Sequence, residues 1–202
     1  MPELAFDRLV PLEPIWALVY GALYAFLIVL PVVVVQQQEM IRRTVWAYIT
    51  VWSVSYLCFL IYPTLAPRPD TVTGDDFAVW GLRFLYDADA PYNCFPSIHV
   101  AHSFVSALAC HRVHRRLGGV ALSSASLVAI STLFTKQHYV ADVIAGIALA
   151  VMAHAVFLGS YARANIPETE SRLAPALALF VGGIVGLGLA GFWVAYQSTM
   201  WR

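Results

Sequence analysis

Two short segments of the sequence place ionisable side chains at the ends of long apolar runs. Residues 93–99 read NCFPSIH, and residues 136–142 read KQHYVAD. Ionisable groups are costly at a membrane boundary, and where they occur they usually serve chemistry or pairing. Together with Arg68-Pro69, the two segments predict a phosphate-handling site built from three separate stretches of the chain.

His138 and Asp142 are four residues apart, which on a helix would put them on one face, one turn from each other. A carboxylate beside an imidazole can hold one ring nitrogen by a hydrogen bond and leave the other nitrogen free and more basic. Such a pair supports nucleophilic attack by the histidine, or general-base activation of an alcohol or water. We therefore expect this pair to be catalytic.

The other two segments offer groups that suit an anion. Pro96 and Ser97 are typical of a helix start, which we predict near residue 96. A helix N-terminus presents free N–H groups and the positive end of the helix dipole, and His99 lies in the same first turn. Arg68 stands between two prolines on a stiff backbone, and its guanidinium can bind phosphate in a bidentate manner.

The composition indicates the solvent in which these groups work. Hydrophobic residues make up 60% of the 202 positions and charged residues 12%, with a mean hydropathy of +0.70. We predict one integral membrane domain over residues 1–202, folded as an all-α, polytopic helix bundle, because backbone groups in lipid must be satisfied within each helix. The six predicted spans are 15–35, 44–63, 95–111, 117–135, 139–159 and 173–196.

The loop 64–94 is the long non-membrane stretch between these spans. Residues 77–86 within it are amphipathic and aromatic, which predicts a short helix lying at the membrane interface, either as a cap over the site or as an anchor alone. With six spans, seven of the 12 Lys and Arg residues fall in the loops opposite the motif residues. Because such loops usually face the cytoplasm, the site is expected on the extracytoplasmic or lumenal face.

Other classes of protein, such as nucleic-acid-binding and disulfide-rich proteins, have little support in the composition. A formal net charge of zero, without a basic cluster interleaved with aromatic residues, argues against nucleic-acid binding. The three cysteines, Cys58, Cys94 and Cys110, lack the spacing of a zinc ribbon and do not indicate a disulfide framework.

Taken in order, the motif residues resemble a known family. Arg68-Pro69, then Pro-Ser-Ile-His at 96–99, then Ser131-Thr132 followed by His138 and Asp142 are similar to the three motifs of the type 2 phosphatidic acid phosphatase superfamily, which includes vanadium haloperoxidases. Those motifs read Lys-x6-Arg-Pro, Pro-Ser-Gly-His and Ser-Arg-x5-His-x3-Asp. The resemblance covers roughly residues 61–150.

The resemblance implies a six-span bundle and a two-step phosphoryl transfer on a lipid phosphate or diphosphate, without a metal or other cofactor. It implies that His138 attacks phosphorus, that Asp142 orients it and that His99 protonates the leaving oxygen. Arg68, Ser97 and backbone amides near Ile98 would hold the phosphate oxygens. Water would then release phosphate from a phosphohistidine.

Three positions depart from the family pattern. Ile61 and Thr132 replace a lysine and an arginine, and Ile98 replaces a glycine, so two of the three usual cations are absent. Lys136 is the candidate to restore one of them. The predicted phosphate-binding residues are therefore Arg68, Ser97, Thr132 and Lys136.

Two alternatives to a hydrolase stay open. The second and third motifs are similar to those of inositol phosphorylceramide synthases and their bacterial relatives, which implies a phosphotransferase that passes a phospho-headgroup to an alcohol. Alternatively, a metal-binding or transport protein could use His99, His102, His138 and Asp142 as ligands. Arg68 and Ser97 argue against the second alternative, because they suit an anion and would oppose a cation.

Overall fold

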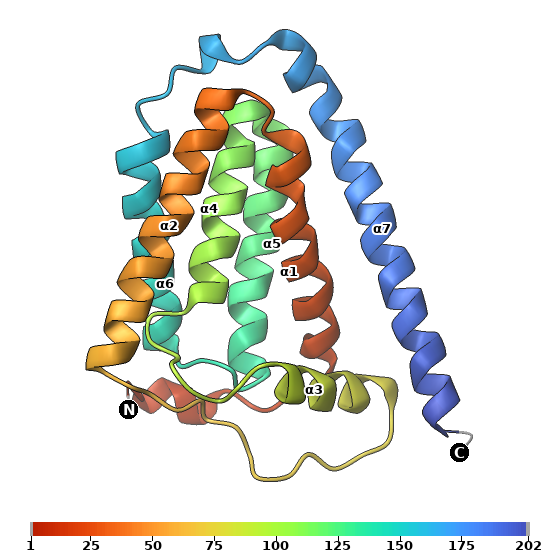
Figure 1. Cartoon of the computed structure of the whole chain (residues 1–202). Coiled ribbons are helices and arrows are strands. Elements are labelled where there is room, and N and C mark those ends of the chain that lie inside the picture. Colours follow the sequence, from red (N-terminus) through yellow and green to blue (C-terminus); the bar gives the residue numbers. More distant parts are fainter. Residues whose placement is uncertain (1, 201–202) are drawn as a thin grey trace.

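The computed structural model describes residues 2–200, and the regular secondary structure in this part of the chain is entirely helical, without a β-strand (Figure 1). Three short helical turns, η1 (Ala5–Leu9), η2 (His154–Leu158) and η3 (Arg163–Asn165), accompany the α-helices. The α-helices are α1 (Ile15–Val34), α2 (Gln38–Ile61), α3 (Phe77–Ala88), α4 (Ile98–Val113), α5 (Arg115–Phe134), α6 (Val140–Ala153) and α7 (Glu168–Met200). The predicted all-α bundle is confirmed.

Five of the described helices are long and apolar enough to cross a membrane: 15–34, 38–61, 115–134, 140–158 and 168–199. The remaining predicted span, 95–111, corresponds to α4, which has 16 residues because it begins only after Pro96 and ends before His114. α4 lies at the centre of the bundle, in contact with α1, α2, α5 and α6. Its helical backbone is thus shielded by other helices, although it is shorter than a full span.

Side-chain caps mark where the central helices begin. Ser97 precedes α4 and accepts a hydrogen bond from the backbone N–H of Val100 at 3.3 Å. His114 separates α4 from α5 and accepts from the N–H of Leu117 through Nδ1 at 3.1 Å. These caps satisfy N–H groups that have no partner within the helix, which fixes the chain direction at each helix start.

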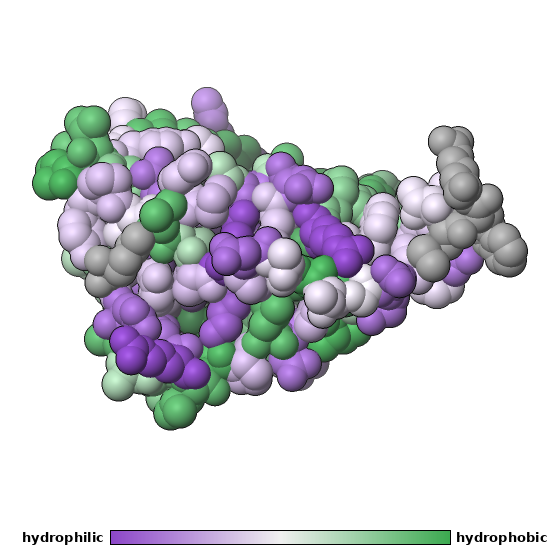
Figure 2. All heavy atoms as spheres, turned by 90° about the horizontal axis from the view of Figure 1, so that it is seen from below, coloured by the Kyte–Doolittle hydropathy of each residue, from purple (hydrophilic) through white to green (hydrophobic). Residues whose placement is uncertain are grey.

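The helix predicted in the 64–94 loop is confirmed as α3, which lies across one end of the bundle (Figure 1). Asp76 caps its first turn by accepting from the N–H of Val79 at 3.0 Å. Val79 and Leu82 are buried, whereas Arg83 and Asp87 are exposed. Hydrophilic residues are spread over this end of the molecule, with hydrophobic residues towards its margins (Figure 2).

Candidate active site

The three motif segments meet at the end of the bundle that α3 crosses. Thr64 ties the first segment to the second, because its hydroxyl oxygen accepts hydrogen bonds from the N–H groups of Cys94 at 2.8 Å and Phe95 at 3.2 Å. The N–H of Ser97 donates to the carbonyl of Asp142 at 3.1 Å, which joins the second segment to the third. The bond between Ser97 and Asp142 places the starts of α4 and α6 side by side.

A close helix contact supports this arrangement. A Cβ atom on Gly146 of α6 would lie 2.6 Å from the carbonyl oxygen of Ser97, nearer than Cβ atoms approach in real structures. Only glycine therefore lets α6 come this close to the start of α4.

His138 and Asp142 form the pair that the sequence predicts, but His138 is not on a helix. α6 begins at Val140, so His138 lies in the turn before it and Asp142 in its first turn. His138 Nδ1 nevertheless lies 3.4 Å from Asp142 Oδ2. The helical spacing argument was wrong for His138, and the turn between Thr135 and Tyr139 brings the two side chains together instead.

Asp142 is fully buried and held in place. Its Oδ2 accepts a hydrogen bond from the N–H of Tyr139 at 2.9 Å, while its Oδ1 has no hydrogen-bond partner. A carboxylate facing His138 Nδ1 favours the tautomer with the proton on Nδ1 and leaves Nε2 with a free electron pair.

The free nitrogen of His138 faces the second histidine. His99 Nδ1 and His138 Nε2 lie 3.4 Å apart, so Asp142, His138 and His99 form one continuous line. The rings of Tyr20 and Tyr24 on α1 contact the His99 ring edge to face, with centroid distances of 5.7 and 5.1 Å. These aromatic contacts hold the His99 ring in its position.

Arg68 reaches the same place from the loop before α3. Its guanidinium donates to the carbonyls of Tyr86 at 3.2 Å and Asp89 at 2.7 Å, and to Oε1 of Gln137. The Asp89 carboxylate lies 3.7 Å from it. Arg68 Nε and Gln137 Nε2 are buried without hydrogen-bond partners. Two buried donors close to the histidines thus have no partner within the part of the protein that the structure describes.

Asp89 lies at the C-terminal end of α3, where burial raises the pKa of its carboxyl and the neighbouring Arg68 opposes this shift. The aspartate is thus partly withdrawn from water although it has a cationic neighbour.

The structure also places the other three predicted phosphate-binding residues, Ser97, Thr132 and Lys136. Ser97 is fully buried, and its hydroxyl oxygen caps α4. The Thr132 hydroxyl donates to the carbonyl of Ala129 at 2.8 Å, so it is turned back onto its own helix. The Thr132 carbonyl accepts from the N–H groups of Gln137 at 2.9 Å and His138 at 3.2 Å, and thereby shapes the turn that carries His138.

Lys136 is turned towards the N-terminal segment and away from the histidines. Its Nζ donates to the carbonyls of Val10 and, at 3.4 Å, Asp7, and its backbone has a φ of 54°. A positive φ is uncommon for a residue with a side chain and indicates a constrained turn. The structure therefore does not bring Lys136 and the Thr132 hydroxyl together with Arg68 and His138.

Two residues beside the predicted ones help to build the site. Asp7, in η1, is buried, and its Oδ1 accepts a hydrogen bond from the N–H of Val140 at 2.8 Å, which caps α6 from a distant part of the chain. Gln137 binds Arg68, as described above. In the sequence, the position of Gln137 next to His138 could have indicated that it contributes to the site. No spacing pattern indicated a role for Asp7.

A pocket of about 250 Å³ opens over the two histidines. Its wall on the α2 side is aromatic, with Tyr56 and Phe59, and the loop side adds Tyr92. The pocket is lined by Tyr56, Phe59, Asp89, Ala90, Tyr92, Asn93, Cys94, Ile98, His99, Gln137 and His138. A polar floor beneath an aromatic rim suits a ligand with a charged head and an apolar body.

The groups around this pocket bear on the alternative that the protein binds a metal ion. One potential ligand atom from each of Cys94, His138 and Asp142 lies within 4.8 Å of the others. Burial raises the pKa of the Cys94 thiol to about 12. The guanidinium of Arg68, which donates to the side chain of Gln137 beside His138, would oppose a cation at this place. His102 lies elsewhere, with its ring 4.5 Å from that of Tyr48.

Comparison with known proteins agrees with this geometry. Residues 4–156 match the PAP2 superfamily. The chain is also similar to a PA-phosphatase related-family protein of Dictyostelium discoideum, with 27% identity over 135 residues, which is 57% of this chain and 24% of that protein. The chain thus spans about a quarter of the length of that relative. No solved structure matches.

The family match is broader than the motifs. It includes Arg68, both histidines and Asp142, and it also takes in η1, which caps α6 through Asp7. Since it covers well over half of the 202 residues, the chain belongs to the PAP2 superfamily.

Proposed function

We propose that this protein is a membrane lipid phosphatase that hydrolyses a lipid phosphate or diphosphate through a phosphohistidine. The observation that carries the proposal is the line from Asp142 through His138 to His99, with both separations 3.4 Å and with Arg68 beside it. Membership of the PAP2 superfamily supports the same reaction class.

The first chemical step uses the free nitrogen of His138. Nε2 attacks phosphorus and forms the N–P bond while the P–O bond to the lipid breaks, and His99 gives its proton to the leaving oxygen. The fully buried Asp142 stabilises the positive charge that develops on the His138 ring. In the second step His99 takes a proton from water, the water oxygen attacks phosphorus, and the N–P bond breaks to release phosphate.

Binding of the phosphate oxygens falls to Arg68 and to the start of α4. Arg68 has an unpartnered buried Nε, and Gln137 beside it has an unpartnered Nε2. The first N–H groups of α4, next to His99, add the positive end of the helix dipole. Fixed donors around the equatorial oxygens are the main requirement of phosphoryl transfer. Ser97 supports this arrangement by capping α4, and Thr132 and Lys136 support it by shaping the catalytic turn.

The surroundings of the pocket favour a lipid over a soluble phosphate ester. The aromatic wall from Tyr56 and Phe59 belongs to α2, which is long and apolar enough to cross a membrane. Arginine residues occur at the start of α2 (Arg42), at the end of α4 (Arg112) and in η3 (Arg163). These three segments lie at the opposite end of the bundle (Figure 1). We therefore propose that the pocket opens on the extracytoplasmic or lumenal face.

A second candidate, a lipid phosphotransferase, is favoured by the charge around the pocket. Among the described residues, Lys136 is directed to the N-terminal carbonyls, which leaves Arg68 as the permanent cation against the histidines. A phosphate monoester carries up to two negative charges at neutral pH, whereas a phosphodiester carries one. The single positive charge of one arginine matches the single negative charge of a phosphodiester. A phosphodiester is the substrate of phospho-headgroup transfer, in which an alcohol attacks phosphorus in place of water.

One experiment separates these reactions. Purified protein in detergent is given lipid phosphates and, separately, phosphodiester lipids, both labelled with ³²P, with and without a long-chain alcohol. The reaction is stopped in alkali and analysed for labelled protein and labelled products. Wild-type protein is expected to carry acid-labile label and to release phosphate, whereas His138→Ala protein should do neither. Unchanged turnover by folded His138→Ala protein would overturn the phosphohistidine mechanism, and label passing only to the alcohol would identify the transferase.

A further inference from the structure

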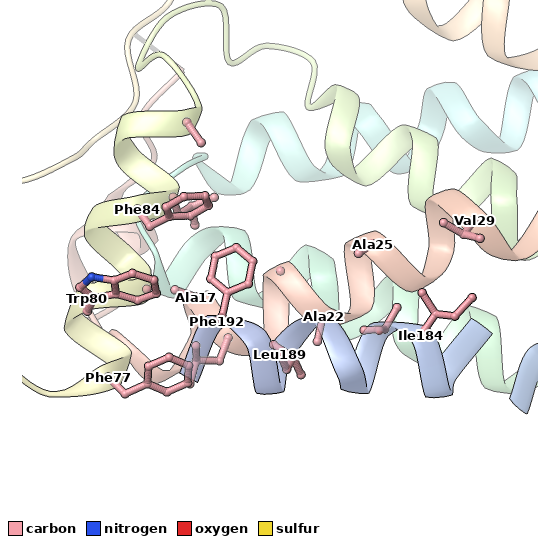
Figure 3. A pocket seen from close by; sticks show the side chains of 17 residues that line it. Ala17, Ala22, Ala25, Val29, Phe77, Trp80, Phe84, Ile184, Leu189 and Phe192 are labelled. Carbon is pink, nitrogen blue, oxygen red and sulfur yellow. The ribbon is translucent and has the colours of Figure 1, made fainter. Parts of the chain in front are cut away.

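A second and larger cavity, of about 450 Å³, lies between α1, α3 and α7 (Figure 3). It is on a different face of α1 from Tyr20 and Tyr24, which contact His99. Its lining has no charged side chain, and the indole of Trp80 supplies the single side-chain polar atom. The lining comprises Ala17, Leu18, Gly21, Ala22, Ala25, Val29, Phe77, Trp80, Gly81, Phe84, Leu85, Ala88, Ile184, Val185, Gly188, Leu189 and Phe192.

The cavity exists because α7 is held at two places and stands off between them. Near its start, Ala174 and Ala178 pack into the main hydrophobic core. Near its end, the ring of Phe192 lies 5.0 Å from that of Phe84 on α3, and the Tyr196 hydroxyl donates to the carbonyl of Asp75 at 2.8 Å. Between these points, added Cβ atoms at Gly21 and Gly188 would find no other atom within 4 Å.

The dimensions and walls of the cavity fit hydrocarbon. Along α1 the lining runs from Ala17 to Val29, which at 1.5 Å per residue is about 18 Å. One leaflet of a bilayer core is about 15 Å thick, since the whole core is about 30 Å. Water does not fill an apolar cavity of this kind. The walls are open to the outside, because Ile184 is 48% and Phe192 39% exposed.

We propose that this cavity binds one acyl chain of a bilayer glycerophospholipid that is not the substrate. α3 closes the end of the cavity with Phe77, Trp80 and Phe84, the kind of aromatic rim that lies at headgroup level (Figure 3). The bound chain fills the gap between α1 and α7 and completes the packing under α3. The proposal does not depend on the reaction that the active site performs.

The lipid site has a consequence for α3. One side of this helix faces the cavity, while its Tyr86 and Asp89 carbonyls receive the guanidinium of Arg68. The chain in the cavity therefore supports the same helix that positions the active-site arginine.

The test uses full-length His138→Ala protein in nanodiscs of phosphatidylcholine that carries a photoactivatable group within one acyl chain. After illumination, mass spectrometry maps the labelled residues. Label is expected to concentrate on 17–29 and 184–192. In the double variant Gly21→Leu, Gly188→Leu the added Cβ atoms meet open space, and the leucine side chains occupy the cavity, so most of this label should be lost.

Gly186→Leu is the matched control, because Gly186 is on the same helix, has open space around it and does not line the cavity. It should keep the wild-type labelling pattern. Equal labelling of all lipid-facing helices, or labelling that the double variant leaves unchanged, would overturn the proposal. So would crosslinks from α7 to a second copy of the chain in place of lipid adducts. Because phosphatidylcholine is the probe and the nucleophile is removed, a failure here is distinguishable from a failure of the proposed reaction.

Discussion

The guanidinium carbon of Arg68 lies 4.6 Å from the centre of the Tyr86 ring. Tyr86 belongs to α3, and its hydroxyl donates to the carbonyl of Thr135 at 2.7 Å, at the start of the turn that carries His138. Burial raises the pKa of Tyr86 to about 12, so the hydroxyl stays protonated and remains a donor. One side chain thus links Arg68, the helix across the site and the turn that carries His138.

Replacement of this ring is expected to weaken phosphate binding. Tyr86→Leu removes both the cation–π contact and the hydrogen bond, and should raise KM by about twofold to thirtyfold, since such contacts contribute about 0.5–2 kcal/mol. Tyr86→Phe keeps the ring under Arg68 and is expected to leave KM close to the wild-type value while lowering the unfolding temperature. Steady-state kinetics on both variants provide the measurement. Equal KM values for the two variants would show that the ring does not position Arg68.

The helical framework could be predicted because it depends on local properties of the chain. Long apolar runs predicted the bundle, and the aromatic amphipathic stretch predicted α3. The length of α4 could not be predicted in the same way. Its 16 residues are shorter than a full span, and only its central place among four other helices makes it stable in the membrane.

The site was predictable as a set of residues but not as a geometry. Spacing placed His138 and Asp142 on one helix, whereas α6 begins at Val140 and a turn positions His138. The cap from Asp7 to Val140 joins residues 133 positions apart, so no local pattern could indicate it. Charge alone suggested Lys136 as a phosphate ligand, but the turn that holds His138 directs its ammonium to backbone carbonyls of the N-terminal segment.

Asp142→Asn tests the role of the carboxylate without changing the size of the side chain. An asparagine can still accept from the N–H of Tyr139, but it no longer favours the proton on His138 Nδ1 or stabilises a charged ring. We expect kcat to fall by about 10³- to 10⁴-fold, as for a nucleophile–base pair that loses its orienting carboxylate. The measurement is kcat with unchanged elution in size-exclusion chromatography. A loss of less than about tenfold would remove Asp142 from the mechanism.

Asp7→Ala tests whether the N-terminal segment positions the start of α6 and the turn that carries His138. The substitution removes the acceptor for the Val140 N–H and should destabilise the protein by about 0.5–2 kcal/mol, the usual effect of losing a helix cap. Because the first turn of α6 carries Asp142, kcat should fall as well. The control is Glu3→Ala, which removes only the exposed ion pair to Arg8. Thermal unfolding and kinetics that do not distinguish the two variants would contradict this role.

Gly146→Ala tests the close contact of α6 with the start of α4. The added Cβ would lie 2.6 Å from the Ser97 carbonyl oxygen, so the helices must separate, at a cost of about 1–3 kcal/mol. Gly119→Ala is the control, because the same change on α5 meets open space and should stabilise the protein by up to about 1 kcal/mol. The two variants should therefore shift the unfolding temperature in opposite directions. A shift in the same direction would show that α6 can relax away from α4.

Asp89→Asn tests whether burial or the ion pair with Arg68 has the larger effect on the pKa of the Asp89 carboxyl, at the end of α3. The pKa of Asp89 is raised in the folded protein, mainly by burial, so the folded state holds this proton more tightly than the unfolded chain. Its contribution to stability is then fully present below the ordinary carboxyl pKa and is lost as the pH rises through the raised value. Asparagine does not titrate.

The unfolding temperature of the Asp89→Asn variant should therefore increase relative to that of the wild type as the pH rises from below the ordinary carboxyl pKa to neutrality. Thermal unfolding of both proteins in the same detergent, at matched ionic strength, measures this difference directly. Adding salt provides a check, since screening weakens attraction between partly exposed charges and leaves the effect of burial in place. If the unfolding temperature of the wild type instead increases relative to that of the variant as the pH rises, the 3.7 Å ion pair between Arg68 and Asp89 outweighs burial. In that case the ionised carboxylate of Asp89 helps to hold Arg68 in place.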